Sequence, residues 1–200
     1  MKTYLKRILV KTMNSLGYHV EINKRGRPSE TSKHRDLLQP YCQGYGCDVG
    51  FGGDPISSSS VRVDLPTPYT RVGQLNVQLG GDCRNLCWFR DGVLDFVYSS
   101  HLLEDFPEHE IIPILTEWLR VLKPGGRLVL LLPDQQRYLK ACRQKGEGPN
   151  PHHSMDNFSL EFLRSMIARL PAVREIAAHP DLGEYSFAII LEKQSPPKTA

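Results

Sequence analysis

Residues 117–134, EWLRVLKPGGRLVLLLPD, decide the fold of this chain. The apolar side chains before Lys123 continue a spacing of three and four residues that starts at Ile111, which is typical of one face of a helix. The KPGG sequence at 123–126 then breaks any regular element. Residues 127–132 are apolar after the first, as expected of a strand buried on both faces of a parallel sheet. A helix, a break and a buried strand in this order predict an α/β domain.

Further strands and helices alternate on both sides of this stretch. Strand–helix alternation favours a three-layer domain with a mostly parallel sheet. Ligands of such sheets bind beyond the carboxyl ends of the strands. The polar stretch 134–157 contains no predicted element. Strands are predicted at 45–49, 61–65, 75–83, 94–99, 127–132, 173–178 and 185–192, and helices at 34–43, 111–122 and 159–169.

The sequence divides into three parts. Residues 1–43 are predicted to hold an amphipathic helix and a polar lid or linker, residues 44–193 form the binding domain, and residues 194–200 form a disordered tail. The helix covers residues 1–17 and has an apolar face opposite most of its lysines, and the linker covers residues 21–33. This pattern favours packing of the helix on the domain, or on a second subunit in a homodimer, over weak contact with a membrane surface.

Composition limits the function classes. The chain has 200 residues, of which 40% are hydrophobic and 24% are charged, as is typical of one soluble globular domain. A net charge of +3 is too mild to predict a nucleic-acid partner. Five scattered cysteines favour reduced thiols over a disulfide framework or a metal site. No apolar run reaches the roughly 20 residues of a membrane span, so the cytoplasm is the predicted compartment.

A glycine-rich turn, DVGFGGDP at 48–55, follows the first predicted strand. Glycines there let the backbone turn sharply and bring its amides close to a ligand. A dinucleotide-binding turn would place its third glycine where Pro55 stands, and a P-loop would need a Gly-Lys-Ser/Thr sequence. The turn therefore disfavours NAD and FAD and excludes a P-loop.

Two aspartates follow the next two predicted strands. Asp64 ends the strand VRVDL, where a carboxylate can accept hydrogen bonds from both hydroxyls of a ribose. Asp82 follows the third strand and can accept from the exocyclic amine of adenine, with the backbone of Cys83 beside it. Each aspartate taken alone is equally typical of an ordinary turn. The glycine turn and both acids in this order favour an adenosyl ligand.

Together these pieces resemble the class I S-adenosylmethionine-dependent methyltransferases of the small type 11 kind. DVGFGGDP, VRVDL and GDC match the cofactor motifs in order, DGVLDFVYSSHLLEDF at 91–106 resembles the strand-four motif, and 117–134 resembles the helix–turn–strand-five motif. The resemblance runs from about residue 44 to 134 and continues loosely to about 193. It implies methyltransferase activity with S-adenosylmethionine as the cofactor. It also implies a Rossmann-like, seven-stranded sheet that is mostly parallel, with the last strand antiparallel.

The resemblance implies roles for individual residues as well. The glycine turn would hold the methionine part of the cofactor, Asp64 its ribose, and Asp82 and Cys83 its adenine, and Ser99 would line the transfer site. The cofactor-binding residues so implied are Asp48, Gly50, Phe51, Gly52, Gly53, Asp64, Leu65, Asp82, Cys83 and Ser99.

Two features depart from the family pattern. Asp54 stands at the family's usual third glycine. Only about seven residues separate Gly53 from the second strand, which is short for a crossover that normally needs about 10–12 residues. The connection is therefore expected to be one turn of helix or an irregular loop through Pro55 and Ser57–Ser60.

His101 and His153 are the predicted catalytic bases for an acceptor that must lose a proton. His101 lies at the ligand-facing end of the fourth strand, and histidine has a suitable ordinary pKa. A capping or supporting histidine is the alternative for His101. His153 lies in NPHHSMD at 150–156, on the long loop where family members often shape the acceptor pocket. No metal site is predicted.

The predicted function is methyl transfer to a small molecule, a sugar or a lipid-linked intermediate. The preference for sugar or lipid rests on analogy with methyltransferases of surface-glycan assembly. The alternative is a catalytically silent, methyltransferase-like binding or regulatory module, which the altered glycine turn and the short connection favour. RNA or protein acceptors are disfavoured, because residues 99–102 read SSHL where an Asn/Asp-Pro-Pro-Tyr motif would stand.

Overall fold

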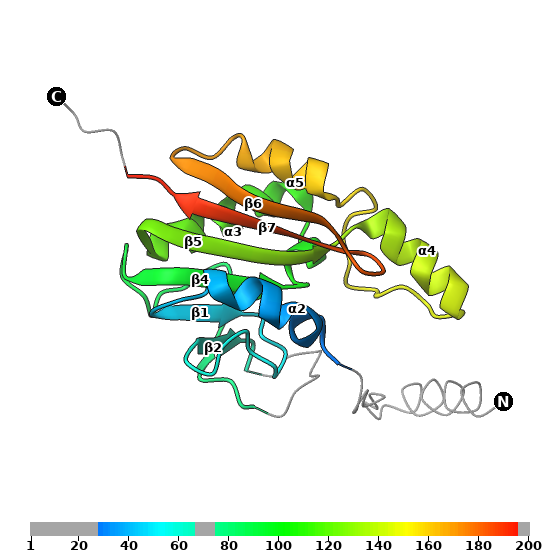
Figure 1. Ribbon diagram of the computed structural model, residues 1–200, viewed down its shortest axis with the longest axis horizontal. Helices are drawn as coiled ribbons and strands as arrows, with labels where there is room; N and C mark the ends of the chain where they lie inside the picture. Colours follow the sequence, from blue (N-terminus) through cyan, green and yellow to red (C-terminus); the bar gives the residue numbers. More distant parts are fainter. Residues whose placement is uncertain (1–27, 67–74, 196–200) are drawn as a thin grey trace.

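The computed structural model describes residues 28–66 and 75–195, and within them seven strands form a single sheet (Figure 1). The strands lie side by side in the order β3-β2-β1-β4-β5-β7-β6. Only β7 runs antiparallel to its neighbours, which confirms the predicted mostly parallel sheet with an antiparallel last strand. The strands are β1 (Gly46–Val49), β2 (Val61–Asp64), β3 (Leu79–Gly80), β4 (Leu94–Ser100), β5 (Leu122–Pro133), β6 (Val173–Leu182) and β7 (Ser186–Lys193).

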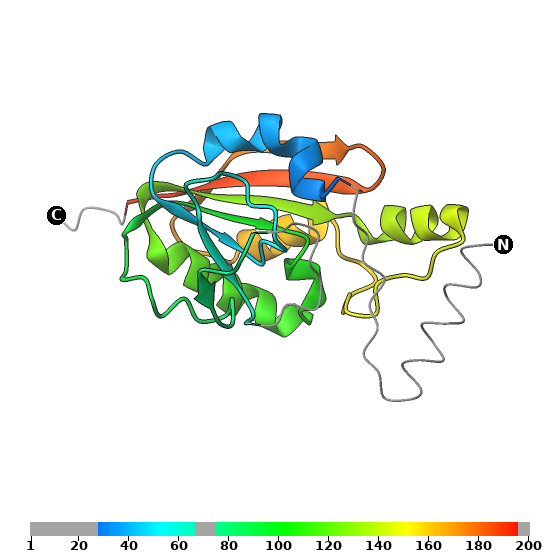
Figure 2. The same ribbon diagram turned by 90° about the horizontal axis from the view of Figure 1, so that it is seen from below.

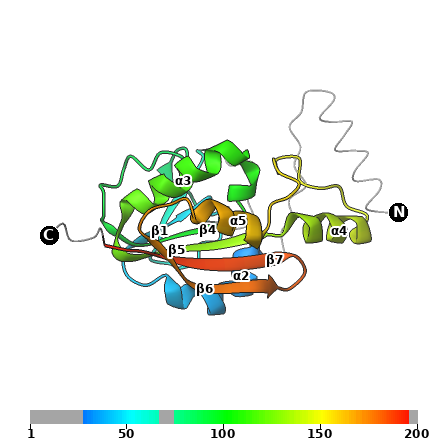
Figure 3. The same ribbon diagram turned by 90° about the horizontal axis from the view of Figure 1, so that it is seen from above.

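Helices cover both faces of the sheet and make the fold three-layered (Figures 2 and 3). α2 (Glu30–Leu38) lies on one face, and α3 (Glu108–Val121) and α5 (Leu160–Ile167) lie on the other. α4 (Gln135–Lys145) extends past the carboxyl end of β5. The described elements also include two short 3-10 helices, η1 (Gln39–Tyr41) and η2 (Leu103–Asp105). The expected Rossmann-like α/β class is confirmed.

The central strands are buried on both faces because their side chains alternate between two apolar cores. Val97 of β4 and Leu130 of β5 pack with Trp118 of α3 in the core on one face. Tyr98, the next residue along β4, packs with Leu38 of α2 in the core on the other face. Successive residues of a strand point to opposite faces, so a doubly covered strand requires an uninterrupted apolar run.

Helix α4 contradicts the expectation of an irregular polar stretch at 134–157. Asp134 caps the start of the helix with its side chain, and Gly146 ends it in the left-handed conformation with a φ of 62°. The helix extends away from the sheet and buries few side chains. It therefore contains few apolar residues, and its two caps are the clearer signals in the sequence.

Helix α2 begins four residues before the predicted start at residue 34. Ser29 caps it by accepting a hydrogen bond from the backbone N of Ser32. The helix gives way at Gln39 to η1, which contains Pro40, as the sequence predicts. Part of the segment predicted as a linker therefore belongs to the layer that covers the sheet.

Strand β5 extends through the KPGG sequence, which the sequence predicts as a break. Leu122 pairs with Leu94 of β4, and the next pairing joins Arg127 to Phe96. The residues between them bulge out of the ladder, and Gly125 has a φ of 78° there. The glycines and proline therefore mark a bulge inside the strand rather than its start.

The connection from β1 to β2 is an irregular loop without a helix, one of the two expected alternatives. Ile56 of this loop is fully buried and packs in the same core as Leu38. The backbone N of Ile56 donates to Asp48 Oδ2 at 2.7 Å. One buried side chain thus takes the place of a crossover helix on this part of the sheet.

Asp54, the residue at the family's usual third glycine, fixes α2 to the glycine turn. Ser29 Oγ and Arg35 Nη2 both donate to its carboxylate, and Arg35 also donates to Pro55 O at 3.2 Å. The φ of Asp54 is not positive, so a glycine is not required at this position. The departure from the family pattern therefore supplies an anchor between two layers.

Replacement of Arg35 by methionine is expected to lower the free energy of unfolding by about 1–2 kcal/mol, because it removes a charged donor from a partly buried carboxylate. Arg35 and Asp54 are 30% and 27% exposed at their side chains. Urea denaturation measures the effect. Arg174→Met is the control, since Arg174 is 62% exposed in its ion pair with Glu192 and should change stability very little. Equal losses in the two variants would contradict the anchor role.

Several expectations fall outside the described residues. The amphipathic helix predicted at 1–17 lies there, and so do residues 67–74 and 196–200. Within the described residues, no helix combines the length and the apolar character needed to cross a membrane. The division of the chain at residue 43 and the surface contacts of residues 1–17 stay predictions.

Candidate functional site

The glycine turn after β1 folds back on the end of β2. Gly50, Gly52 and Gly53 have φ values of 68°, 60° and 95°, in the left-handed region that favours glycine. Gly50 N donates to Val63 O at 2.8 Å, and a Cβ on Gly50 would lie 2.7 Å from a methyl carbon of Leu102. The conformation of Gly50 therefore favours glycine, and a larger residue would also push the Leu102 side chain aside.

Asp64 joins the glycine turn to the loop after β3. Its Oδ2 accepts from Gly52 N at 3.1 Å, its Oδ1 accepts from Leu65 N at 2.8 Å, and its backbone O accepts from Gly81 N at 2.9 Å. Burial raises the pKa of Asp64 against the opposing effect of the two amide hydrogen bonds. A carboxylate has about four acceptor sites, so about two remain for further donors. The three predicted cofactor elements thus meet at one edge of the sheet.

Asp48 lies beneath the glycine turn and is 1% exposed. Its Oδ1 has no hydrogen-bond partner within the described part of the chain. Burial raises the pKa of Asp48 well above its ordinary value. An unsatisfied buried acceptor costs about 1–3 kcal/mol, so a donor from a ligand would be stabilising at this oxygen.

Asp82, just after β3, is held by Arg84. Arg84 donates to it from the backbone N at 2.9 Å and from the guanidinium at 2.6–3.0 Å, and it also binds Glu110. These bonds lower the pKa of Asp82. The carbonyl of the next residue, Cys83, accepts from Trp118 Nε1 at 2.8 Å. Both predicted adenine contacts lie at the expected edge, but the Asp82 carboxylate is already bound to a cation.

Three other predicted cofactor contacts differ in their exposure. Phe51 is 5% exposed, so its side chain packs inside the protein, whereas Leu65, directly after β2, is 43% exposed. Ser99 is fully buried, and its Oγ donates to Val49 O at 3.0 Å. The hydroxyl of Ser99 therefore ties β4 to β1 from within the sheet. Any contact of these residues with a ligand stays a prediction.

His101 follows β4 with its backbone in the left-handed region, at a φ of 51°. Non-glycine residues seldom adopt this conformation, and such positions cluster at functional sites. Its backbone N donates to Leu131 O at 2.8 Å. The imidazole Nε2 lies 3.2 Å from Ser186 Oγ of β7, and the ring meets Tyr185 edge-on at 5.9 Å. The strained backbone thus directs the ring toward the carboxyl edge of the sheet.

A chain of hydrogen bonds fixes the tautomer of His101. Ser186 Oγ gives its one hydrogen to Glu30 Oε2 at 3.1 Å, so it can only accept from His101. Nε2 must then carry the proton, and Nδ1 keeps its lone pair. Burial lowers the pKa of His101 to about 4, so the ring is neutral at pH 7. Nδ1 is therefore available as a proton acceptor.

His153 reaches the same place from the loop after α4. Its Nε2 lies 3.7 Å from Glu104 Oε1, and His101 Nδ1 lies 3.5 Å from the same oxygen. The Nδ1 of His153 is 2.8 Å from Gln135 Oε1, and its ring lies 4.7 Å from the Tyr138 ring. Burial lowers the pKa of His153 to about 4 and raises that of Glu104 well above its ordinary value. The two histidines that the sequence predicts separately form one cluster.

Glu104, Glu30 and Ser186 belong to this cluster but are absent from the sequence prediction. Glu104 stands three residues after His101, and an H-x-x-E pattern at a strand end is a signal that could have identified it. Glu30 and Ser186 are 156 positions apart, so no local pattern connects them. They meet because the start of α2 lies next to the start of β7 in the folded chain.

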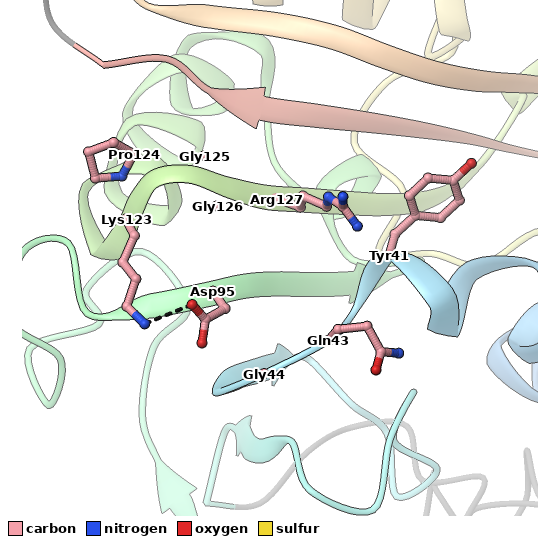
Figure 4. Close-up of a pocket in the computed structure, with 9 residues that line it drawn as sticks. All are labelled: Tyr41, Gln43, Gly44, Asp95, Lys123, Pro124, Gly125, Gly126 and Arg127. Atoms are coloured by element: carbon pink, nitrogen blue, oxygen red, sulfur yellow. Dashed lines mark hydrogen bonds and ion pairs between the residues drawn. The ribbon is translucent and has the colours of Figure 1, made fainter.

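A hollow of about 510 Å³ lies at the opposite edge of the sheet, at the amino ends of β1, β4 and β5 (Figure 4). Lys123 pairs with Asp95 at 2.7 Å, and the Arg127 guanidinium lies 5.8 Å from the centre of the Tyr41 ring. The charged groups of Lys123 and Arg127 are therefore already bound by residues that line the hollow. Ligands of parallel sheets bind at the carboxyl ends, so the edge that carries Asp64 and the histidine cluster is the candidate site.

Residues 44–130 match one protein family, described as a methyltransferase domain. The matched segment contains the glycine turn, both strand-end aspartates and His101. No curated protein matches the sequence. The family match therefore covers the cofactor side of the candidate site.

Solved structures share the fold over most of their length. A protein from Pyrococcus horikoshii OT3 aligns with a TM-score of 0.64 and 19% identity, over 90% of this chain and 99% of its own. A SAM-dependent methyltransferase from Archaeoglobus fulgidus aligns with a TM-score of 0.62 and 16% identity, over 82% of this chain and 92% of its own. A SAM-dependent methyltransferase from Methanosarcina mazei aligns with a TM-score of 0.57 and 18% identity, over 80% of this chain and 98% of its own. At these identities the likeness establishes a common fold.

Proposed function

We propose that this protein is a methyltransferase that uses S-adenosylmethionine to methylate a hydroxyl group of a small molecule, a sugar or a lipid-linked intermediate, because residues 44–130 match the methyltransferase domain family. The observation that carries the proposal is the meeting of two groups at one sheet edge. The glycine turn and Asp64 form the first group, linked by the Gly52 N–Asp64 Oδ2 hydrogen bond. His101, with a free lone pair on Nδ1, belongs to the second.

The side chains at this edge suit the polar groups of S-adenosylmethionine. Asp48 Oδ1, which has no partner in the described residues, would accept from the α-ammonium group of the methionine part. Asp64 would accept from the two ribose hydroxyls with its remaining acceptor sites. The turn at Gly50, Gly52 and Gly53, whose φ values lie in the left-handed region, would bring the backbone close to the ligand.

When bound, S-adenosylmethionine supplies a methyl group that its positively charged sulfur makes electrophilic. His101 would take the acceptor's hydroxyl proton at Nδ1 as the hydroxyl oxygen receives the methyl group. Ser186 would keep accepting from Nε2, and Glu30 would stabilise the charge that the imidazole gains. Orientation can contribute about 7–11 kcal/mol to such a reaction. A positioned base typically adds about 10²- to 10⁴-fold.

The acceptor side of the edge combines aromatic rings with a few polar groups. Tyr138 and Tyr185 lie 5.2 Å apart in a T-shaped pair, with His153 against one ring and His101 against the other. Small-molecule sites typically have such apolar walls and a few polar groups that fix orientation. This arrangement supports a small hydroxylated acceptor.

The full-length chain, incubated with methyl-labelled S-adenosylmethionine and panels of sugars, lipid-linked sugars and small alcohols, tests the proposal. We expect one cofactor bound per chain by calorimetry. We also expect label in a product of at least one panel, with an equal amount of S-adenosylhomocysteine. A chain that fails to bind S-adenosylmethionine would rule the proposal out.

A catalytically silent binding module is the second candidate function, and the contact of Arg84 with Asp82 favours it. A carboxylate that already accepts several hydrogen bonds from a guanidinium has fewer sites for the adenine amine. Cofactor binding without label in any acceptor would favour this candidate over the enzyme.

A further inference from the structure

We propose that Glu104, Asp105 and His153 form a binding site for one divalent transition-metal ion beside His101, although the sequence predicts no metal site. Each of the three residues offers one ligand atom, and these atoms all lie within 4.8 Å of one another. Glu104 is fully buried, and neither of its carboxylate oxygens has a hydrogen-bond partner in the described residues. A buried carboxylate in this state is costly unless a cation or a donor meets it.

The two histidines beside Glu104 direct lone pairs at it rather than protons. Gln135 Oε1 can only accept, so His153 carries its proton on Nδ1 and leaves the lone pair on Nε2, 3.7 Å from Glu104 Oε1. His101 carries its proton on Nε2 and leaves the lone pair on Nδ1, 3.5 Å from the same oxygen. Two lone pairs therefore converge on the Glu104 carboxyl group, and a cation between them would satisfy all three groups.

The spacing of His153 and Glu104 suits a metal ion. Zinc-like ions bind imidazole nitrogen and carboxylate oxygen at about 2.0–2.2 Å, which puts two ligand atoms of one ion about 3–4 Å apart. The separation of 3.7 Å between His153 Nε2 and Glu104 Oε1 falls in this range. The hydrogen bond from His153 Nδ1 to Gln135 is the outer-shell contact that metal-binding histidines usually have.

Backbone contacts hold the ligands in place without an ion. Ser154 N donates to Glu104 O at 3.0 Å, and Ser154 Oγ donates to Asp105 O at 2.6 Å. These two bonds fix the loop that carries His153 onto η2, which carries both acids. The site is therefore assembled by three hydrogen-bonded segments: the end of β4 with η2, the start of α4, and the loop that follows α4.

One imidazole and two carboxylates favour a first-row ion such as Mn²⁺ or Zn²⁺ over Mg²⁺ and Ca²⁺, which prefer all-oxygen sites. Three protein ligands leave open positions for a further oxygen. If the function proposed above is correct, the acceptor oxygen would bind there, and His101 Nδ1 would lie next to it. Ion binding itself does not depend on that function.

Mn²⁺ binding to the chelator-treated, full-length protein tests the site, with free Mn²⁺ measured by electron paramagnetic resonance. We expect one ion per chain. Glu104→Gln, which keeps the side-chain shape, and His153→Gln should each weaken binding by about 100-fold or more. His152→Gln is the matched control, because His152 adjoins His153 but is exposed, and it should leave binding unchanged. Circular dichroism of each variant verifies its fold.

The outcomes separate this proposal from the proposed function. A chain that binds S-adenosylhomocysteine but no Mn²⁺ overturns the metal site alone and leaves a shared proton as the link between Glu104 and the histidines. Mn²⁺ bound with equal affinity by the wild type and Glu104→Gln overturns it as well. Loss of Mn²⁺ binding in Asp64→Asn would show that the ion binds at Asp64, beside the glycine turn, and would contradict the assignment. Mn²⁺ binding without cofactor binding supports the site and rules out the proposed enzyme.

Discussion

Replacement of His101 by glutamine is expected to slow methyl transfer by about 10²- to 10⁴-fold, the usual contribution of a positioned base. Glutamine can still donate to Ser186, so the hydrogen-bonded chain to Glu30 keeps a partner. It cannot take a proton, so an acceptor hydroxyl must lose its proton to water instead. The affinity for S-adenosylhomocysteine should stay unchanged, because the glycine turn and Asp64 are untouched. Single-turnover rates on the identified acceptor and calorimetry measure the two quantities.

Two further variants sharpen this test. His109→Gln is the matched control, since His109 of α3 is 81% exposed at its side chain and should retain the wild-type rate. Ser186→Ala removes the group that holds the His101 tautomer, so it should lower kcat while KM for the acceptor stays constant. A full rate in His101→Gln would show that His101 is a supporting residue and not the base.

Replacement of Asp64 by alanine is expected to weaken S-adenosylmethionine binding by about 10- to 100-fold, which corresponds to the roughly 1–3 kcal/mol of a lost charged hydrogen-bond partner. The carboxylate would no longer accept from the ribose hydroxyls. It would also no longer hold Gly52 N, so the glycine turn would lose its link to β2. Calorimetric titration of S-adenosylmethionine into each protein measures the change.

The control for this variant is Asp156→Ala, which removes an exposed aspartate on the loop after α4. Its affinity should equal that of the wild type. The affinity of Asp64→Asn should fall between those of Asp64→Ala and Asp156→Ala, because an amide retains one of the two acceptor oxygens. Wild-type affinity in Asp64→Ala would mean that the ribose does not bind at this strand end.

The central strands and the glycine turn could be predicted because local chemistry decides them. A doubly covered strand such as β5 needs an apolar run, and a left-handed turn at Gly50 needs glycine, so both leave signals in a short window of sequence. The place of Asp64 could be predicted as well, because parallel strands run in the same direction and their carboxyl ends lie at one edge of the sheet. These features follow from the sequence without knowledge of distant contacts.

The contacts that assemble the rest of the site could not be predicted, because they join segments that are distant in the sequence. Glu30 of α2 meets Ser186 of β7, which lies 156 positions away, and Arg84 binds Glu110 of α3, which lies 26 positions away. Helix α4 extends away from the sheet, and its mostly polar composition is typical of a loop. Its capping residues are the clearer signals in the sequence, but caps alone are weak signals.

A crystal structure of the full-length protein with S-adenosylhomocysteine tests the central claim most directly. The claim predicts the ribose hydroxyls on Asp64, the amino group of the homocysteine part near Asp48, and the sulfur facing His101. The ligand bound instead in the hollow beside Asp95 and Lys123, or a glycine-turn edge filled by packed side chains, would contradict it.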